Sequence, residues 1–542
     1  MVKKIIILLV LQSFVALSFS QTIHPKIKGW HLLGPAEGYL GVEVDKAYAL
    51  VKDKKSTTVI IAIIDSGIDT AHEDLKSVLW NNPGEIPGNG KDDDGNGYTD
   101  DIHGWNFDGG ANGENVVTNS HEIARVYHTW EDTFEGKKEK NIPDNKKFLF
   151  GQWKKSEQLL KSQYEEYEKN IKRVENTSAI LQLTNNLITG YFGKKEFTRN
   201  DLFRINSRDS LGWAASVWSN ILSRGMDSTT RNTAVLEEVE GYRNALLNNK
   251  KRYEEPPQDF RGALTKDKYD DINDRFYGNN NLQSGSGNHG THVSGIIGAI
   301  RNNNIGVDGI VQDVRLMIIR AVPGGDEHDK DVALAIRYAV DNGAKIINMS
   351  FGKPVSPYKQ FVDDAVRYAA SKNVLIVHGA GNDGEDLAEH VFYPNPFFLD
   401  GTSATNMLTV GASGDYSTGK IVAEFSNYSD KVVDIFAPGV YINSTTPFNT
   451  YDAYDGTSMA SPVAAGVAGL IKSYFPELSP EQLINLLMRS GTEVKEDLNL
   501  PGEKDKKTTL KKICKSGRIV NAYEAMKLAL DIYGRGNAQN IN

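Results

Sequence analysis

The stretch that decides the fold reads Val59-Ile60-Ile61-Ala62-Ile63-Ile64-Asp65-Ser66-Gly67. Its six consecutive apolar residues predict a strand buried on both faces, and an acidic residue follows where the strand ends. Similar apolar runs recur at 314–319, 344–349, 374–377, 407–410 and 432–436, and helical patterns lie between or after them at 331–342, 359–372, 480–488 and 521–532. Alternating strands and helices are typical of a parallel sheet flanked by helices, so we expect an α/β fold.

One segment, about 108–283, interrupts this alternation because it contains no convincing buried strand. Two sets of apolar residues in it recur at helical spacing, which predicts amphipathic helices with Lys and Glu on their solvated faces. We therefore expect a large, mainly helical insertion in the α/β domain. The two sets are Trp153, Leu160, Tyr164, Tyr167, Ile171 and Val174, and Val235, Val239, Tyr242 and Leu246.

Composition narrows the class of protein. Of the 542 residues, 39% are hydrophobic, which is enough for a sizeable core and excludes wholesale disorder. The net charge of −9 argues against nucleic acid as a partner, because no basic field would offset phosphate charge. Cys514 is the single cysteine, so an intrachain disulfide is excluded.

The N-terminus predicts export. Lys3 and Lys4 precede apolar runs at 5–11 and 14–17, and Ser18-Phe19-Ser20 offers small residues for cleavage. A membrane anchor is the alternative, but the apolar positions are few for a span of about 20 residues. We expect a signal peptide at 1–20 and a secreted or periplasmic protein with no stable membrane anchor. The expected order is a short extension at 21–57, a catalytic domain at 58–533 interrupted by 108–283, and a polar tail at 534–542.

Four short motifs carry the chemistry, each at a strand end or a helix start. They contain an acid, a base, an amide and a hydroxyl, and nucleophilic acyl transfer needs such a set. Singly, each has a plainer explanation: the aspartate as a helix cap, the glycines as a turn or a phosphate loop without its lysine. Their joint occurrence in this order distinguishes a catalytic set from these plainer explanations. They are Asp65-Ser66-Gly67-Ile68, His289-Gly290-Thr291-His292-Val293-Ser294-Gly295, Gly379-Ala380-Gly381-Asn382-Asp383-Gly384 and Gly456-Thr457-Ser458-Met459-Ala460-Ser461-Pro462.

These four motifs resemble those of the subtilisin-like serine endopeptidases, the subtilase or peptidase S8 family. The resemblance implies a subtilisin-like α/β fold in which Asp65 orients, His289 is the general base, Ser458 the nucleophile and Asn382 the oxyanion donor. It assigns His292 no catalytic role. It also implies that substrate binds as an added strand along Ser350, Phe351 and Gly352, and at Gly381.

Three details add to the resemblance or depart from it. Tyr393-Pro394 resembles the position of a cis-proline in these enzymes. Val463 stands where many members have a histidine that is not catalytic. The segment 21–57 is too short for the usual inhibitory propeptide, so either folding needs no such chaperone or the insertion has taken a regulatory part.

A calcium site is predicted in the acidic loop 92–101. Asp92, Asp94 and Asn96 occupy positions 1, 3 and 5 of an EF-hand-like loop, with the Tyr98 carbonyl at position 7. Position 12 is a histidine, so Asp100 or Asp101 would have to complete the coordination; the alternative is a solvated acidic turn.

The resemblance implies a second calcium site. Asp74 matches a calcium-ligating aspartate of the family, and the loop with Asn302 and Asn303 resembles the one that completes that site, although it is one residue longer.

The sequence thus predicts an exported, calcium-stabilised serine endopeptidase that acts on protein or peptide substrates. A catalytically silent, calcium-dependent binding protein, or acyl transfer to amines and ester hydrolysis at the same site, are the alternatives. Asp383 and the acidic residues at 326–331 suggest a modest preference for basic residues on the acyl side of the cut, unless they are solvated loop residues.

Overall fold

The computed structural model describes residues 28–223, 229–283, 287–414, 420–503 and 505–534, so the predicted signal peptide lies outside the described residues. The chain divides into two compact units. One is Ile123–Pro257, and the other joins Ile23–Glu122 to Gln258–Asn542. Within the described ranges, no helix is both long enough and apolar enough to cross a membrane.

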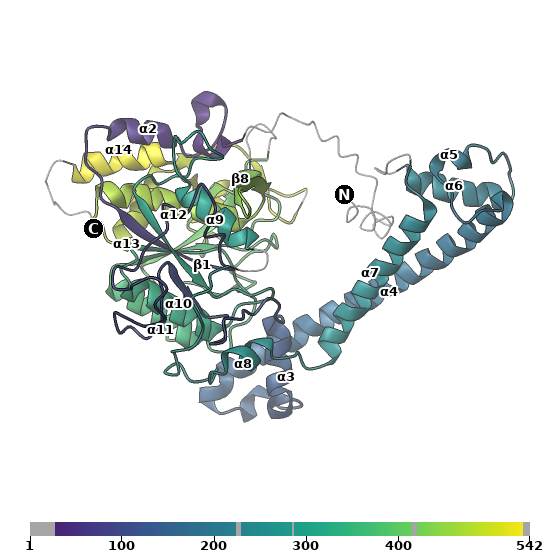
Figure 1. The fold of residues 1–542 in the computed structure, drawn as a ribbon, viewed down its shortest axis with the longest axis horizontal. Helices are drawn as coiled ribbons and strands as arrows, with labels where there is room; N and C mark the ends of the chain where they lie inside the picture. Colours follow the sequence, from purple (N-terminus) through teal and green to yellow (C-terminus); the bar gives the residue numbers. More distant parts are fainter. Residues whose placement is uncertain (1–27, 224–228, 284–286, 415–419, 504, 535–542) are drawn as a thin grey trace. The chain divides into compact units, whose positions relative to one another are not determined.

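The larger unit is built on one twisted sheet with the strand order β10-β13-β7-β6-β5-β4-β1-β3-β2 (Figure 1). Its neighbouring strands pair in parallel, except for the antiparallel pair β10 and β13 at one edge. The predicted α/β fold with a mainly parallel sheet is therefore confirmed. The strands are β1 (Val59–Asp65), β2 (Gly104–Asn106), β3 (Val314–Arg320), β4 (Ile346–Met349), β5 (Leu375–Gly379), β6 (Met407–Ser413), β7 (Ile435–Pro438), β10 (Thr492–Glu493) and β13 (Arg518–Ile519).

Helices cover both faces of this sheet, and the alternation of side chains along β1 separates two cores. Ile61 and Ile63 face a core shared with α9, α12, α13 and α14, whereas Ala62 and Ile64 face a core shared with α10 and α11. The helices are α2 (Val44–Leu50), α8 (Phe260–Thr265), α9 (Asn288–Gly298), α10 (Asp329–Asp341), α11 (Lys359–Ser371), α12 (Thr457–Tyr474), α13 (Pro480–Ser490) and α14 (Ala522–Tyr533). Two small sheets pair β8 (Ile442–Thr446) with β9 (Thr450–Tyr454), and β11 (Leu498–Asn499) with β12 (Lys507–Thr508).

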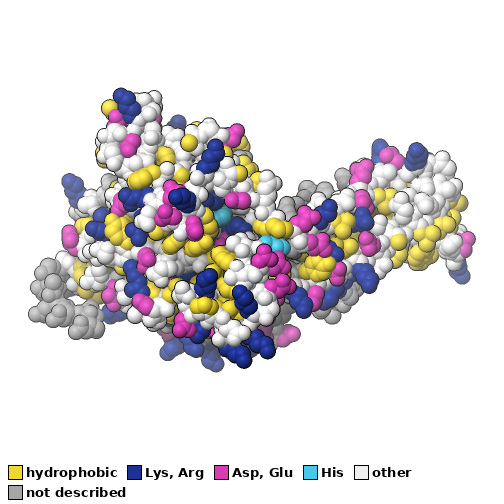
Figure 2. Space-filling view, turned by 90° about the horizontal axis from the view of Figure 1, so that it is seen from below, with side chains coloured by type: hydrophobic (Ala, Val, Ile, Leu, Met, Phe, Trp, Pro, Cys, Tyr) yellow, Lys and Arg dark blue, Asp and Glu magenta, His cyan; other side chains and the backbone are white. Residues whose placement is uncertain are grey.

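The smaller unit is helical, as predicted for the insertion. α4 (Lys147–Phe192) lies beside α7 (Asn232–Glu254), and α5 (Arg199–Leu202) and α6 (Ser210–Leu222) lie at one end of this pair (Figure 1). α3 (Glu122–Phe134) precedes them. Charges of both signs lie between hydrophobic side chains on its surface (Figure 2). Its own core contains residues of both predicted helical stripes, among them Ile171, Val174, Val235, Val239 and Leu246.

The chain leaves and re-enters the larger unit at adjacent points. Asn106 and Asn279 exchange backbone hydrogen bonds of 2.9 and 3.1 Å. The segments 108–122 and 258–283 accordingly belong to the larger unit. The compact helical unit therefore covers a shorter range of the sequence than the interruption at 108–283 in the strand pattern.

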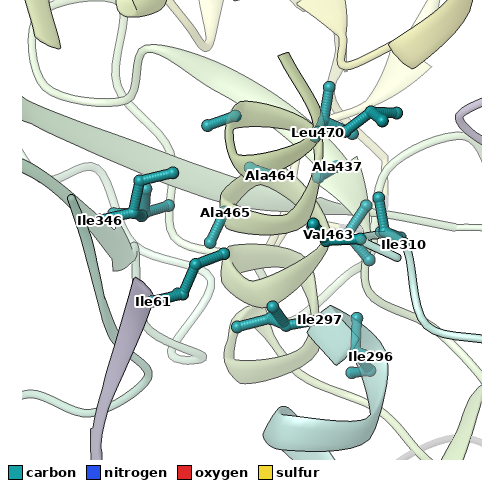
Figure 3. Close-up of a cluster of buried hydrophobic side chains, with 14 of the residues drawn as sticks. Ile61, Ile296, Ile297, Ile310, Ile346, Ala437, Val463, Ala464, Ala465 and Leu470 are labelled. Atoms are coloured by element: carbon teal, nitrogen blue, oxygen red, sulfur yellow. The ribbon is translucent and has the colours of Figure 1, made fainter. Parts of the chain in front are cut away.

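Helix α12 runs through the core of the larger unit, where Val463, Ala465 and Leu470 lie among buried side chains of neighbouring elements (Figure 3). Small residues let it lie close to its neighbours. A Cβ on Gly466 would lie 2.8 Å from Cβ of Ile310, and a Cβ on Gly469 would lie 2.7 Å from Cδ1 of Ile61. Val463 is fully buried in the same core.

Candidate active site

Asp65 and His289 are paired. Strand β1 ends at Asp65, helix α9 begins one residue before His289, and His289 Nδ1 lies 2.8 and 3.0 Å from the two carboxylate oxygens. Gly290 permits this approach, because a Cβ there would lie 2.1 Å from the carbonyl oxygen of Gly67. A carboxylate only accepts, so Nδ1 carries a proton and Nε2 of the neutral ring is a free base.

The charge state of His289 follows from two opposed effects. Burial disfavours the charged ring, but the Coulomb attraction and hydrogen bond of Asp65 outweigh it and raise the pKa of His289 above its usual value. The His289 side chain keeps 39% of its surface exposed, so its ring remains accessible.

Ser458 lies in the first turn of α12, and a proline shapes its surroundings. Pro462 has no N–H, so the Ser458 carbonyl loses its usual partner four residues on and accepts a hydrogen bond of 2.9 Å from Ser350 Oγ. Ser458 Oγ in turn donates to the Ser350 carbonyl at 3.0 Å. The hydroxyl is thus held at the end of β4, and rotation about Cα–Cβ must release it before it can bond to a base.

Asn382 is fixed to the same helix start by Thr457, which the motif spacing did not indicate. Its Oδ1 accepts from the Thr457 N–H at 2.9 Å and from Thr457 Oγ1 at 3.0 Å. A backbone N–H can only donate, so the amide oxygen faces Thr457 and Nδ2 faces away from it. Asn382 is exposed, which leaves this N–H group available to a ligand.

The expected substrate-binding residues follow two neighbouring strands. Ser350, Phe351 and Gly352 come after β4, and Gly381 comes after β5 with φ at 99°, a conformation that favours glycine. The Phe351 carbonyl is 2.8 Å from His378 Nε2. The peptide bond between Tyr393 and Pro394 is cis, as expected.

His292 is a packing residue in this structure. Its side chain is fully buried and stacks on Tyr454 with ring centroids 4.3 Å apart, and its Nε2 lies 3.1 Å from the Asp452 carbonyl. Burial lowers the pKa of His292 to about 4, so the ring is neutral at ordinary pH.

The acidic loop gathers three carboxylates, one of which the loop spacing did not indicate. Glu85, Asp92 and Asp94 each place one oxygen within 4.8 Å of the others. Glu85 is buried, and its Oε2 has no hydrogen-bond partner among the described residues. An orphaned carboxylate oxygen beside two others is a donor set that suits Ca²⁺.

Other predicted calcium ligands have different partners. Asp100 accepts from the N–H groups of residues 88–90, and buried Asp101 accepts from Asn82, Asn96 and Tyr338. Asn96 Oδ1 accepts from the Tyr98 N–H. The Tyr98 side chain packs edge-on against Trp105.

Asp74 lies against the 302–307 loop. Asn303 Nδ2 donates to Asp74 Oδ1 at 2.6 Å, and the Val307 N–H donates to Oδ2 at 3.3 Å. Burial raises the pKa of Asp74. Asn302 has positive φ, and its N–H donates to Asp308, so Asn303 is the asparagine that the structure brings to Asp74.

The acidic residues at 326–331 point to internal partners, which removes their support for a basic preference. Asp329 pairs with Lys353 at 2.8 Å, and Asp331 pairs with Arg261 at 2.5 Å. Asp326 accepts from the Glu122 N–H at 2.8 Å. Periodicity could not reveal these partners, because they lie far away in the sequence.

The fold and site together define a parallel-sheet protein with an Asp–His pair and a serine at a buried helix start, an arrangement typical of serine hydrolases. The chain belongs to the subtilase family, whose model matches residues 56–509. It is 41% identical over 187 residues to "Thermophilic serine proteinase" of Bacillus sp. (strain AK1), covering 34% of this chain and 43% of that protein. It is 37% identical over 218 residues to "Subtilisin Savinase" of Lederbergia lenta, covering 40% and 74%.

The match spans about half the length of several curated relatives. One is "M-protease" of Shouchella clausii (strain KSM-K16), which is 38% identical over 216 residues. That match covers 40% of this chain and 52% of that protein. A solved structure described as proteases from Pseudoalteromonas arctica covers 92% of this chain and 96% of that one, at 18% identity and a TM-score of 0.44.

Proposed function

We propose that this chain is a serine endopeptidase in which Asp65, His289 and Ser458 form the catalytic triad and Asn382 assists the oxyanion. Family membership supports the class of reaction. The observation that carries the proposal is the bond between His289 Nδ1 and Asp65, because it leaves Nε2 as the free base.

In the proposed reaction, Ser458 Oγ attacks the carbonyl carbon of the scissile peptide bond while His289 Nε2 takes its proton. The resulting oxyanion accepts hydrogen bonds from Asn382 Nδ2 and the Ser458 N–H. One such donor contributes about 3 kcal/mol to the transition state. Protonated His289 then gives its proton to the leaving amine, and water repeats the sequence on the acyl-enzyme to release the acid.

The direct test uses a fluorophosphonate probe and a casein substrate. Wild-type protein should hydrolyse casein and be labelled, and the Ser458→Ala variant should do neither. The matched control is Ser461→Ala, since Ser461 is on the same helix but donates to Asn348 Oδ1 at 2.7 Å in the interior. Casein hydrolysis that persists in purified Ser458→Ala protein would sink the proposal.

We also propose that Ca²⁺ stabilises the protein. Glu85, Asp92 and Asp94 would hold one ion, with Asn96, the Tyr98 carbonyl, Asp100 and Asp101 as the further ligands expected from the loop pattern. Asp74 with Asn303 is the proposed second position, which Asn302 adjoins. At the first position the ion would offset the repulsion among the three carboxylates, and at both positions it would crosslink loop segments.

The proposal further includes export, with removal of a signal peptide at 1–20. The proposed substrates are proteins or peptides, and no nucleic-acid partner or membrane anchor is proposed. The basic and apolar N-terminal pattern supports export. Mass spectrometry of protein secreted by an expressing host should show an N-terminus beyond Ser20, and an intact Met1 would contradict it.

A further inference from the structure

Two chain segments bound the space beside Ser458. Ser350 belongs to the segment after β4 and receives the Ser458 hydroxyl at 3.0 Å, whereas Asn382 belongs to the segment after β5. In the proposed acyl-enzyme, the substrate carbon is bonded to Ser458 Oγ and its oxygen faces Asn382. The side chain on the acyl side of the cut therefore has these two segments on either side of it.

The ring of Phe392 already lies between these segments. A Cβ on Gly352 would lie 2.3 Å from Cε1 of Phe392 and 2.6 Å from its Cζ. A Cβ on Gly381 would lie 3.2 and 3.3 Å from the same two atoms. One edge of a single ring thus contacts both of the glycines that are expected to bind substrate, and it closes the space between them.

The backbone beside Phe392 is held, so the ring has little freedom to withdraw. The adjacent residue Tyr393 exchanges two backbone hydrogen bonds of 2.9 Å with Lys353, directly after Gly352. The His378 ring packs beside the Phe392 ring with centroids 6.2 Å apart. Phe392 itself is only partly buried, so part of its surface remains accessible.

We propose that Phe392 limits the residue on the acyl side of the scissile bond to Gly, Ala or Ser. The inference rests on the proposed endopeptidase function and names its substrate class. A large side chain would have to displace a packed ring, and such a built-in clash discriminates against it. Asp329 and Asp331 pair internally with Lys353 and Arg261, so the inference rests on size and not on the charge of these acids.

The test compares succinyl-Ala-Ala-Pro-X-p-nitroanilides with X as Ala, Leu or Phe. For the wild type we expect kcat/KM to be at least ~10-fold higher with Ala than with Phe, the scale on which pocket size discriminates. In Phe392→Ala we expect kcat/KM for Phe to rise by about 10-fold or more, so that the ratio of the Ala value to the Phe value falls. Active sites are titrated with a small fluorophosphonate, and rates are expressed per titrated site. Misfolded variant protein therefore does not lower the measured kcat/KM.

Phe397→Ala is the control, because Phe397 lies in the same loop but is 45% exposed, and it should leave the Ala-to-Phe ratio unchanged. Wild-type enzyme that prefers Phe to Ala would overturn the inference, as would an unchanged ratio in titrated Phe392→Ala. Absence of both hydrolysis and labelling would instead overturn the proposed function, and this inference with it.

Discussion

At the scale of single residues, Asp65 has two effects on His289. It fixes the proton on Nδ1, and it raises the pKa of the ring against the opposing effect of burial. The two effects are separable, because the first sets the rate at high pH and the second sets the pH at which activity disappears. In the proposed reaction His289 acts as a base, so activity is lost as the pH falls through this raised pKa.

Replacing Asp65 by Asn tests both effects. We expect kcat/KM at high pH to fall by about 10³–10⁴-fold, because the ring loses its orienting carboxylate. The remaining activity should disappear at a lower pH than in the wild type, because the charge that raised the pKa of His289 is gone. The measurement is the pH profile of kcat/KM on a peptide anilide.

Asp69→Asn is the matched control, since Asp69 lies in the same loop and accepts from the Ala71 and Phe448 N–H groups. The Asp69→Asn variant should lose activity at the same acidic pH as the wild type, so the acid limb of its pH profile should be unchanged. An acid limb in Asp65→Asn that coincides with the wild-type limb would contradict the assignment of His289 as the base that Asp65 tunes.

At the scale of elements, a buried ion pair joins α8 to α10 where the chain returns from the helical insertion. Arg261 is 1% exposed and contacts Asp331 with two nitrogens, at 2.5 and 2.6 Å. It also pairs with Asp267 at 2.7 Å. Removing one partner of such a pair leaves an uncompensated buried charge.

Asp331→Asn should therefore lower the free energy of unfolding by about 3–5 kcal/mol. In the exposed pair Lys420–Glu424, whose side chains are 50% and 53% exposed, Glu424→Gln should cost less than about 1 kcal/mol. Urea midpoints in the inactive Ser458→Ala background check both values without self-digestion. Equal midpoints for the two variants would show that burial of the pair adds nothing.

The acidic loop 92–101 is a second element whose contribution to stability is measurable. We expect thermal midpoints in the Ser458→Ala background to fall on EDTA treatment, because an ion that binds only folded protein stabilises it. Glu85→Gln should reduce this difference by removing a ligand. Asp93→Asn should not, since Asp93 accepts from Ile86 and Asn89 outside the cluster. An undiminished EDTA effect in Glu85→Gln would exclude that site.

Elements were predictable where the information is local. Apolar runs such as 59–64 and 314–319 predict strands because burial on both faces needs no partner to be known. The run at 432–436 predicts a strand over its whole length, but β7 begins only at Ile435. Val432 and Val433 are buried in a separate hydrophobic cluster, before the pairing of β7 begins. The pairing of Asp65 with His289 was expected from the resemblance to a family and not from sequence spacing, since 224 residues separate them. The contacts of Glu85 and Phe392 depend on loops folding back from elsewhere.

At the scale of the whole molecule, each compact unit has its own core. The helical unit is held by α4, α6 and α7 around buried residues such as Trp218, whereas every proposed catalytic residue lies in the larger unit. The ends of the larger unit's two pieces lie close together. Glu122 donates to Asp326, and Arg261 pairs with Asp331, so both ends contact the segment that begins α10.

A variant in which a Gly-Ser linker of about eight residues replaces 123–257 should therefore fold, since such a linker has a mean span of about 16 Å. We expect its kcat/KM on Suc-Ala-Ala-Pro-Ala-p-nitroanilide to stay within about 5-fold of the full chain, a change of about 1 kcal/mol. Active-site titration gives the concentration of folded enzyme, and the same deletion with Ser458→Ala excludes a contaminating protease. A soluble deletion variant that is neither labelled nor active would show that the helical unit is required to assemble the site, even though each unit has its own core.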